Sequence, residues 1–161
     1  MKNISFAAGS FAGPFSQHEL ESIRRLVRLD IPYFEFDPEY LGFIATFHGG
    51  KPIQKYFATV SGVRLPIDYF LNFQESNNDH FDSLSVSAVW SAIDDRSSPE
   101  LIPFATTPGG DFLCFQAAQG SRPSIVLWSH ELSEEDNPHT EFVATDFSQF
   151  ISSLQSEPMA N

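Results

Sequence analysis

The sequence contains little cysteine, few basic residues and no long apolar run. Its single cysteine, Cys114, cannot form a disulfide within the chain, and no cluster of Cys and His has the spacing of a structural zinc site. No apolar stretch approaches the roughly 20 residues that span a membrane, and the N-terminal segment is not apolar enough for an export signal. We therefore expect a cytoplasmic protein that does not enter a membrane.

Acidic residues are in excess, and they are concentrated in one part of the chain. The 161 residues include 9 Lys and Arg against 21 Asp and Glu, which gives a formal net charge of −12. Residues 1–64 carry a charge of +1, whereas residues 65–161 carry −13 and have only Arg96 and Arg122 as cations. Such a charge repels nucleic acid and anionic lipid and attracts a basic partner. The open alternative is that the acids only keep the protein soluble.

Four segments have the apolar spacing of amphipathic helices. A capping-box pattern at Ser16 begins the first helix, and an Asp37-Pro38 pair begins the second, which a glycine pair closes. Apolar spacing alone marks the third, and Asp146 caps the fourth. The expected helices cover residues 16–31, 37–50, 83–94 and 146–154.

Apolar runs between these helices predict strands. A Ser61-Gly62 turn joins the first two strands, and a turn from Thr107 to Gly110 joins the next pair. The second strand alternates with a period of two, which assigns one set of its side chains to the core: Leu65, Ile67, Tyr69, Leu71 and Phe73. The expected strands cover residues 55–60, 65–73, 101–105, 111–116, 124–129 and 141–144.

The order of these elements predicts the fold class. Two helices precede two strands, and one helix, a run of strands and a last helix follow, which favours an α+β domain over a doubly wound parallel sheet. We expect a single domain over residues 1–161, with a mainly antiparallel mixed sheet of about six strands flanked by about four helices. The core spans residues 16–155, and residues 1–14 and 156–161 are expected to fray.

Short sequence blocks follow one another along the chain: Ile31-Pro32, Asp37 through Pro52, Leu101 through Ala105, Gly110 through Phe115, Val126 through Glu131 and Phe142 through Phe147. In this order and spacing they resemble the SUKH superfamily, which includes a fungal regulator of cell-wall assembly and many bacterial immunity proteins against toxins. The resemblance covers residues 16–155. One departure is His48, where the family usually has asparagine before the glycine pair.

The resemblance implies a binding protein, for which we expect no catalytic group, metal or cofactor. Immunity proteins of this group hold a cognate toxin, often a nuclease, and block it in the cytoplasm of the producing cell. The acidic second part of the chain fits a basic toxin. Two alternatives stay open: a regulatory scaffold like the fungal members, and a small hydrolase with carboxylates near Asp111 or His130. No nucleic-acid or membrane partner is expected, and the choice between monomer and homodimer is open.

Three acidic stretches are the best candidates for contact with such a toxin. One precedes the third helix, one ends it, and one lies in the loop after residues 124–129. Asp94 and Asp95 oppose the dipole of their own helix, so they contribute nothing to it and are available for another role. Whether the stretches share a face or are simply solvated is open. With one strand-end aromatic included, the candidate toxin-binding residues are Glu75, Asp79, Asp82, Asp94, Asp95, Asp111, Trp128, Glu131, Glu134, Glu135 and Asp136.

Metal and thiol chemistry have plainer interpretations. His130, His139 and the acids between them lie in a predicted loop, which does not fix the geometry of metal ligands. Cys114 lies in an alternating strand, where a thiol behaves as a small core group.

Aromatic residues are abundant, and most fall on the predicted core faces. Tyr33, Phe34 and Phe36 are different because they lie in the short connection between the first two helices. Exposed aromatics beside carboxylates are typical of interface hot spots, and burial in the core is the alternative for these three and for Trp128.

Overall fold

The computed structural model describes residues 3–74 and 83–158 of the chain, and its helices lie where the sequence predicts them. Each begins at a side-chain cap: Ser16, Asp37, Ser85 and Asp146 accept hydrogen bonds from backbone N–H groups of the first turn. No helix in the described ranges combines the length and apolarity needed to cross a bilayer. The helices are α1 (Gln17–Asp30), α2 (Pro38–Thr46), α4 (Val86–Ile93) and α5 (Phe147–Ser153), and the short 3-10 helix η1 (Asp94–Arg96) continues α4.

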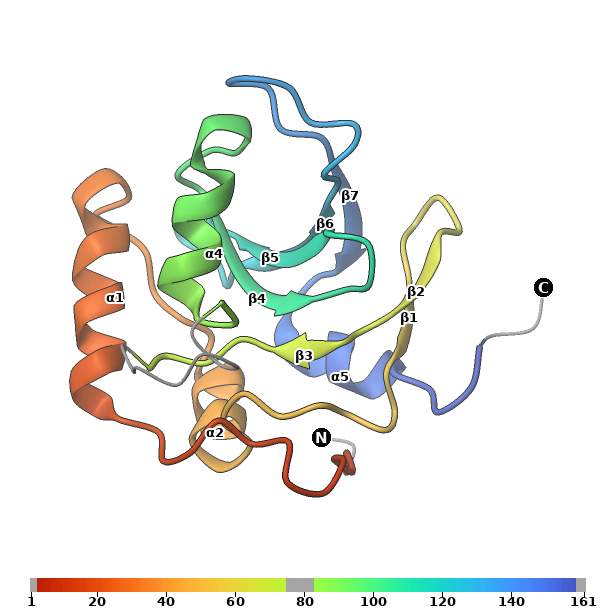
Figure 1. Cartoon of the computed structure of the whole chain (residues 1–161). Helices are drawn as coiled ribbons and strands as arrows, with labels where there is room; N and C mark the ends of the chain where they lie inside the picture. The colour runs from red at the N-terminus through yellow and green to blue at the C-terminus, as the bar shows by residue number, and fades with distance from the viewer. Residues whose placement is uncertain (1–2, 75–82, 159–161) are drawn as a thin grey trace.

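The strands form two antiparallel sheets, which confirms the α+β class (Figure 1). The main sheet has the order β3-β4-β5-β6-β7, so each strand pairs with its neighbour in the chain, and β1 and β2 form a separate hairpin around the predicted Ser61-Gly62 turn. The strands are β1 (Tyr56–Ala58), β2 (Arg64–Pro66), β3 (Tyr69–Phe70), β4 (Leu101–Thr106), β5 (Phe112–Gln116), β6 (Ser124–Trp128) and β7 (Thr140–Ala144).

The single strand expected over residues 65–73 is wrong, because this segment divides between the two sheets. β2 ends at Pro66, and β3 begins at Tyr69 as the partner of β4. Burial does not alternate either: Phe70, Leu71 and Phe73 are all buried, whereas Tyr69 is half-buried. The segment leaves the half-solvated hairpin and passes between layers of the core, so its apolar residues are covered on more than one side.

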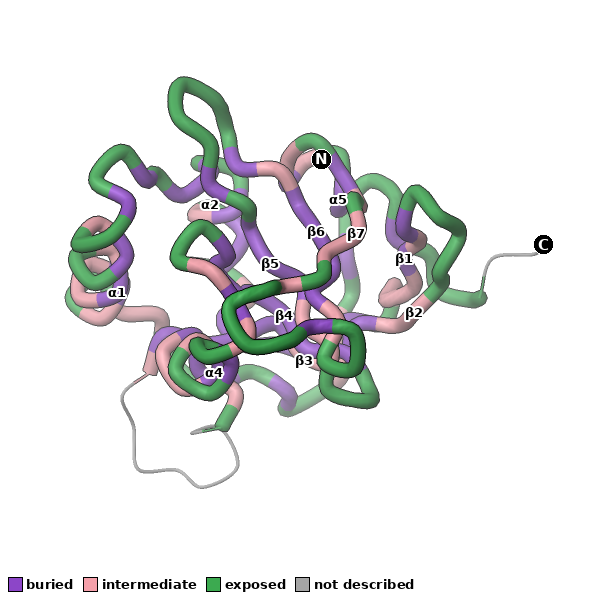
Figure 2. The backbone as a smooth tube through the Cα atoms, turned by 90° about the horizontal axis from the view of Figure 1, so that it is seen from above, coloured by how far each residue is buried: buried purple, intermediate pink, exposed green. Residues whose placement is uncertain are grey.

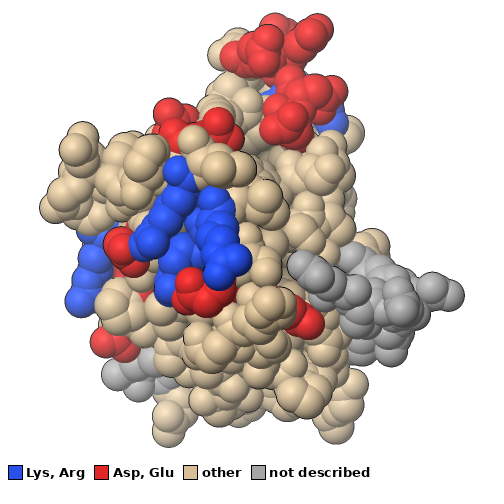
Figure 3. All heavy atoms as spheres, turned by 90° about the vertical axis from the view of Figure 1, so that its left-hand side faces the viewer, with Lys and Arg blue, Asp and Glu red and all other residues tan. Residues whose placement is uncertain are grey.

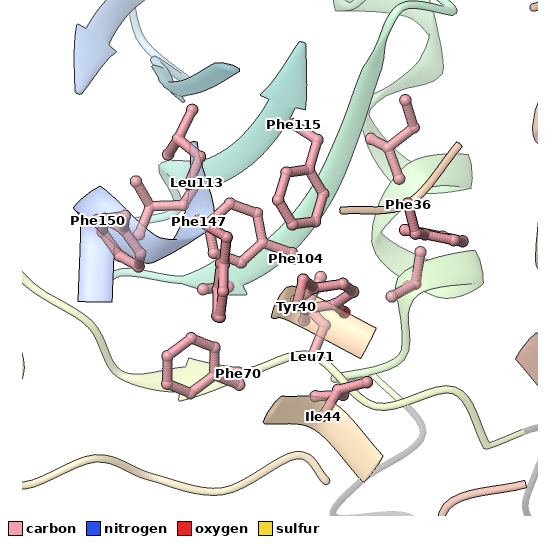
Figure 4. Packing of buried hydrophobic residues seen from close by; sticks show 14 of the residues in the cluster. Phe36, Tyr40, Ile44, Phe70, Leu71, Phe104, Leu113, Phe115, Phe147 and Phe150 are labelled. Atoms are coloured by element: carbon pink, nitrogen blue, oxygen red, sulfur yellow. The ribbon is translucent and has the colours of Figure 1, made fainter. Parts of the chain in front are cut away.

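Aromatic rings fill the space between the main sheet and helices α2 and α5 (Figure 4). The ring of Tyr40 in α2 lies 4.8 Å from Phe115 and 5.2 Å from Phe147, measured between centroids, and both contacts are edge-on. Phe104 stacks on Phe115 at 4.4 Å. Edge-on and offset pairs at such distances stabilise a core beyond the area they bury.

The opposite face of the sheet is covered by the end of α4. Alternate residues of β5 and β6 point to this side, because successive side chains of a strand face opposite ways. They form a second buried cluster with Ile93 and Leu101: Cys114, Val126 and Trp128. Both faces of the central strands are therefore buried, as the tube in Figure 2 shows for β5 and β6.

The expectation that residues 1–14 fray is wrong for residues 3–14, which pack along the end of α2. Ile4 and Ala12 are buried, and the Ala12 N–H donates to the His48 carbonyl at 3.0 Å. Gly49 and Gly50 make this approach possible, because a Cβ at Gly49 would lie 2.7 Å from the Ala12 Cβ. The glycine pair, which follows the end of α2, therefore makes room for the N-terminal segment.

Candidate protein-interaction surface

Trp128, at the end of β6, is buried beneath η1. Its side chain is 0% exposed, and its indole N–H donates to the Arg96 carbonyl of η1 at 2.9 Å. The ring stacks on Phe112 at 5.9 Å, and the Arg96 guanidinium lies over it at 5.8 Å from the centroid. The prediction that Trp128 contacts a partner is therefore wrong: β6 turns this ring toward the end of α4, where it holds η1 in place.

The loop between β6 and β7, residues 129–139, has a defined conformation of its own. The Glu134 N–H and the Asn137 N–H each donate to the other residue's carbonyl, at 3.1 and 2.9 Å, which closes a tight turn. Ser133 is buried, and its hydroxyl accepts from the His139 N–H at 2.9 Å. Asp136 at φ 55° occupies the left-handed region, where an aspartate is among the better tolerated residues. The loop is thus held by its own hydrogen bonds.

Hydrogen bonds from this loop bring together acids that are distant in the sequence. The Asp136 N–H donates to the Asp95 carbonyl at 3.0 Å, and the Arg96 guanidinium donates to the His130 carbonyl at 3.1 Å. The His130 N–H donates to the Asp111 carboxylate at 2.8 Å. The loop is therefore fixed both to η1 and to the turn between β4 and β5.

We call the resulting surface the acidic end: Asp94, Asp95, Asp111, Glu131, Glu134, Glu135 and Asp136. Asp111 is half-buried and the other six are exposed. Figure 3 shows acidic side chains gathered at the top of the molecule, with basic side chains below them. Seven carboxylates on one preformed surface create a strong negative potential there, since their fields add.

Leu132 also belongs to this surface, although it is not among the predicted contact residues. Its side chain is 61% exposed between acidic neighbours. An exposed leucine beside carboxylates offers apolar contact as well as charge, which is the combination that a protein interface uses at its centre and rim. The available signal was an apolar residue in a predicted acidic loop, where neither strand nor helix periodicity accounts for it.

The remaining predicted contact residues are three acids and, between the first two helices, three aromatic residues. Glu75, Asp79 and Asp82 lie outside the described residues. Phe34 and Phe36 are buried in the core, whereas Tyr33 is 41% exposed.

The groups considered for chemistry are placed apart or buried. Within residues 3–74 and 83–158, no three His, Cys, Asp or Glu side chains are arranged to hold a metal ion. Cys114 is fully buried, and burial raises the pKa of its thiol, so it stays protonated and unreactive. What the acidic end offers is a rigid, charged surface.

Comparison with known proteins gives one family and one distant relative. The model of the SMI1 / KNR4 family (SUKH-1) matches residues 31–153. The SPbeta prophage-derived uncharacterized protein YokK of Bacillus subtilis (strain 168) is 34% identical over 85 residues, which cover 51% of this chain and 39% of that relative. This chain thus matches well under half the length of the relative. No solved structure gives a significant match.

Proposed function

The chain belongs to the SMI1 / KNR4 family (SUKH-1), and from this premise we propose that it is an immunity-type protein that binds and neutralises a basic toxin without catalysis. The observation that carries the proposal is the family match over residues 31–153, which covers most of the core and all of the acidic end. The prophage origin of one relative supports it, because mobile elements are a setting in which toxin resistance is useful.

The negative charge of the acidic end supports a basic partner. Six carboxylates of the acidic end are exposed, and Arg96 is half-buried among them with its guanidinium bonded to the His130 carbonyl. A surface of this kind accelerates encounter with a cationic protein and disfavours anionic ones. A toxin that acts on nucleic acid carries a basic surface for phosphate, and the acidic end complements that surface.

Rigidity supports the mode of binding. The loop of residues 129–139 is held by the Glu134–Asn137 turn and by the bond from Asp136 to Asp95. A preformed loop loses little conformational freedom when it binds, so more of the contact energy appears as affinity. Leu132 supplies the apolar contact that a purely charged surface lacks.

Binding to the protein encoded beside this chain is the direct test. We expect the pair to co-purify, and the chain to suppress the toxicity of its neighbour in co-expression. Replacing Glu134, Glu135 and Asp136 by Gln, Gln and Asn removes three charges, and asparagine still tolerates the φ of residue 136. The association rate should fall by about tenfold at low salt, and its dependence on salt should weaken.

A control removes two charges outside the acidic end. Asp30 and Glu157 are exposed, and their Asn and Gln variants should associate at the rate of the unmodified protein. A Leu132→Ala variant should dissociate faster with little change in association. If no neighbouring protein is bound or silenced, the immunity proposal fails; if both charge variants associate equally fast, the acidic end is not its binding surface.

A further inference from the structure

A groove of about 520 Å³ lies far along β6 from the acidic end. One wall is the connection between α1 and α2, and the other is the turn between β5 and β6, which is the exposed loop rising at the upper left of Figure 2. Because β6 connects that turn to the loop of residues 129–139, the groove and the acidic end lie at opposite ends of this strand. The volume is typical of a site for a small ligand or a few peptide side chains.

The buried carboxylate of Asp37 pairs with the guanidinium of Arg122 at this groove. The Asp37 side chain is 0% exposed, and its two oxygens accept from the Glu39 N–H at 3.0 Å and the Phe147 N–H at 3.3 Å. The Arg122 guanidinium lies 3.6 Å from Asp37 Oδ1, which is ion-pair range, and it makes no hydrogen bond to any described residue. Arg122 is 54% exposed, so its N–H groups remain available to an acceptor in the groove.

Charge at the groove favours an anionic ligand. Glu35 also lines it, but its carboxylate pairs with Arg28 on the other side. Asp37 is beyond reach of a ligand because it is fully buried. Of the charged groups lining the groove, Arg122 is therefore the one presented to a ligand without a hydrogen-bonding partner of its own.

One wall of the groove is the connection of residues 33–36, which follows a turn closed by a hydrogen bond from the Phe34 N–H to the Ile31 carbonyl at 3.0 Å. Burial alternates along it, with Tyr33 and Glu35 exposed and Phe34 and Phe36 buried. The Glu35 backbone makes no hydrogen bond to another described residue. An extended peptide that lies beside this unpaired backbone gains main-chain hydrogen bonds there, and its side chains enter the adjoining groove.

We propose that this groove binds an extended peptide segment that carries a carboxylate next to an apolar side chain. The carboxylate accepts from Arg122, the apolar side chain packs against Tyr33 and Pro123, and the peptide backbone pairs with that of Glu35. This site differs from the acidic end in place and in charge, so it represents a second contact and does not depend on the toxin proposal.

Amide chemical shifts of the ¹⁵N-labelled chain test this directly. The probe is acetyl-Leu-Asp-Phe-Leu-amide, and the matched probe has asparagine in place of aspartate. We expect the acidic probe to shift amides of residues 33–37 and 118–122 in a saturable way. The asparagine probe and an Arg122→Gln protein should each weaken binding by at least about tenfold, because a hydrogen bond between two charges is lost.

Two further variants separate the site from general effects. Tyr33→Ala should weaken binding severalfold through lost apolar contact, while Arg25→Gln, an exposed arginine on α1, should leave it unchanged. Equal binding of the two probes, of a lysine-containing probe or of acetate alone overturns the proposal, and so does an acidic probe that shifts no groove amide. Binding of a basic toxin at the acidic end should be unaffected by Arg122→Gln, so the two proposals fail separately.

Discussion

Tyr40 brings a hydroxyl into the aromatic core without a partner. Its side chain is fully buried, and its oxygen makes no hydrogen bond to the described residues. Burial in these apolar surroundings also raises the pKa of Tyr40, because the ionised form loses its water. The ring stabilises the core, while the hydroxyl costs free energy because it has lost its hydrogen bonds to water.

Replacing Tyr40 by phenylalanine should therefore leave the free energy of unfolding unchanged or raise it by about 1–2 kcal/mol. Tyr40→Ala should lower it by about 3–5 kcal/mol, since it leaves a cavity among packed rings. Urea denaturation measures both. Tyr33→Phe is the control at an exposed tyrosine and should change stability by less than about 0.5 kcal/mol. A clear loss in Tyr40→Phe would mean that the hydroxyl has a partner after all.

His48 is a buried connector with a defined protonation state. The Phe73 N–H donates to Nε2 at 2.8 Å, so Nε2 has no proton. Nδ1 lies 3.1 Å from the Gly13 carbonyl, which only accepts, so Nδ1 carries the proton. A second proton would place two donors against each other at Nε2. Burial lowers the pKa of His48, so the neutral form is favoured in the folded state.

Stability should consequently fall in mildly acidic solution. The unfolded chain takes up the His48 proton near pH 6.5, whereas the folded chain takes it up only at lower pH. The stabilisation is fully present above about pH 7, and it is lost as the pH falls from 6.5 toward the lowered value, by at most about 1.4 kcal/mol per pH unit. Urea denaturation of the native and His48→Asn proteins from pH 5 to 8 should show a difference that shrinks with acid. His18 is exposed on α1, and the stability of a His18→Asn variant should follow the native curve. A stability difference between the native and His48→Asn proteins that stays constant with pH would contradict the protonation state assigned to His48.

At the scale of elements, local signals predicted the helices well. Ser16 and Asp37 cap the helices that they were expected to cap, because capping depends on residues within one turn. The second oxygen of Asp37 bonds to Phe147, far along the chain, and no local pattern encodes that contact. The break between β2 and β3 escaped prediction for the same reason: the pairing of Tyr69 with Thr106 decides it.

Substituting Gly49 tests how the N-terminal segment packs against the end of α2. Gly49 has φ +69°, and an added Cβ would lie 2.7 Å from the Ala12 Cβ, so Gly49→Ala combines backbone strain with a clash. We expect a loss of about 2–4 kcal/mol in the free energy of unfolding. Gly42 is the matched control, because it lies in α2 with no atom near its Cβ position. Gly42→Ala should stabilise by about 0.5–1 kcal/mol.

Combining Gly49→Ala with Ala12→Gly separates the two causes. The second change removes the nearest clashing methyl group, so it should recover part of the loss and leave the part due to φ and to the Asn72 Cβ, which lies 3.1 Å from the added Cβ. No recovery would mean that residues 3–14 do not pack against Gly49 in solution.

At the scale of the whole molecule, the acidic surface could be predicted only in part. The sequence places the acids in loops and at the end of the third helix, and that much follows from local patterns. Their convergence depends on backbone bonds such as that from Asp136 to Asp95, and on the burial of Trp128 beneath η1. Such contacts join elements that are distant in the sequence, so spacing along the chain does not reveal them. Trp128 shows the opposite case, in which a residue predicted to be exposed is buried. A strand covered on one face can end in the same residue types as a strand covered on both faces, so the sequence does not distinguish the two.

Concentrating like charges should cost stability, which gives the acidic end a measurable signature. Glu135 lies among the seven carboxylates, whereas Glu157 is exposed outside them. At low ionic strength Glu135→Gln should raise the Tm by a few degrees, because it relieves repulsion, and Glu157→Gln should change it less. In about 0.5 M NaCl the two variants should melt alike, since screening reduces the repulsion.

Scanning calorimetry at both salt concentrations measures this. If Glu135→Gln also slows association with the proposed basic toxin, the charge is kept for binding at the expense of stability. A lower Tm for Glu135→Gln at low salt would instead mean that its carboxylate is compensated locally, and the acidic end would then lose the repulsion on which its proposed attraction for a basic partner rests.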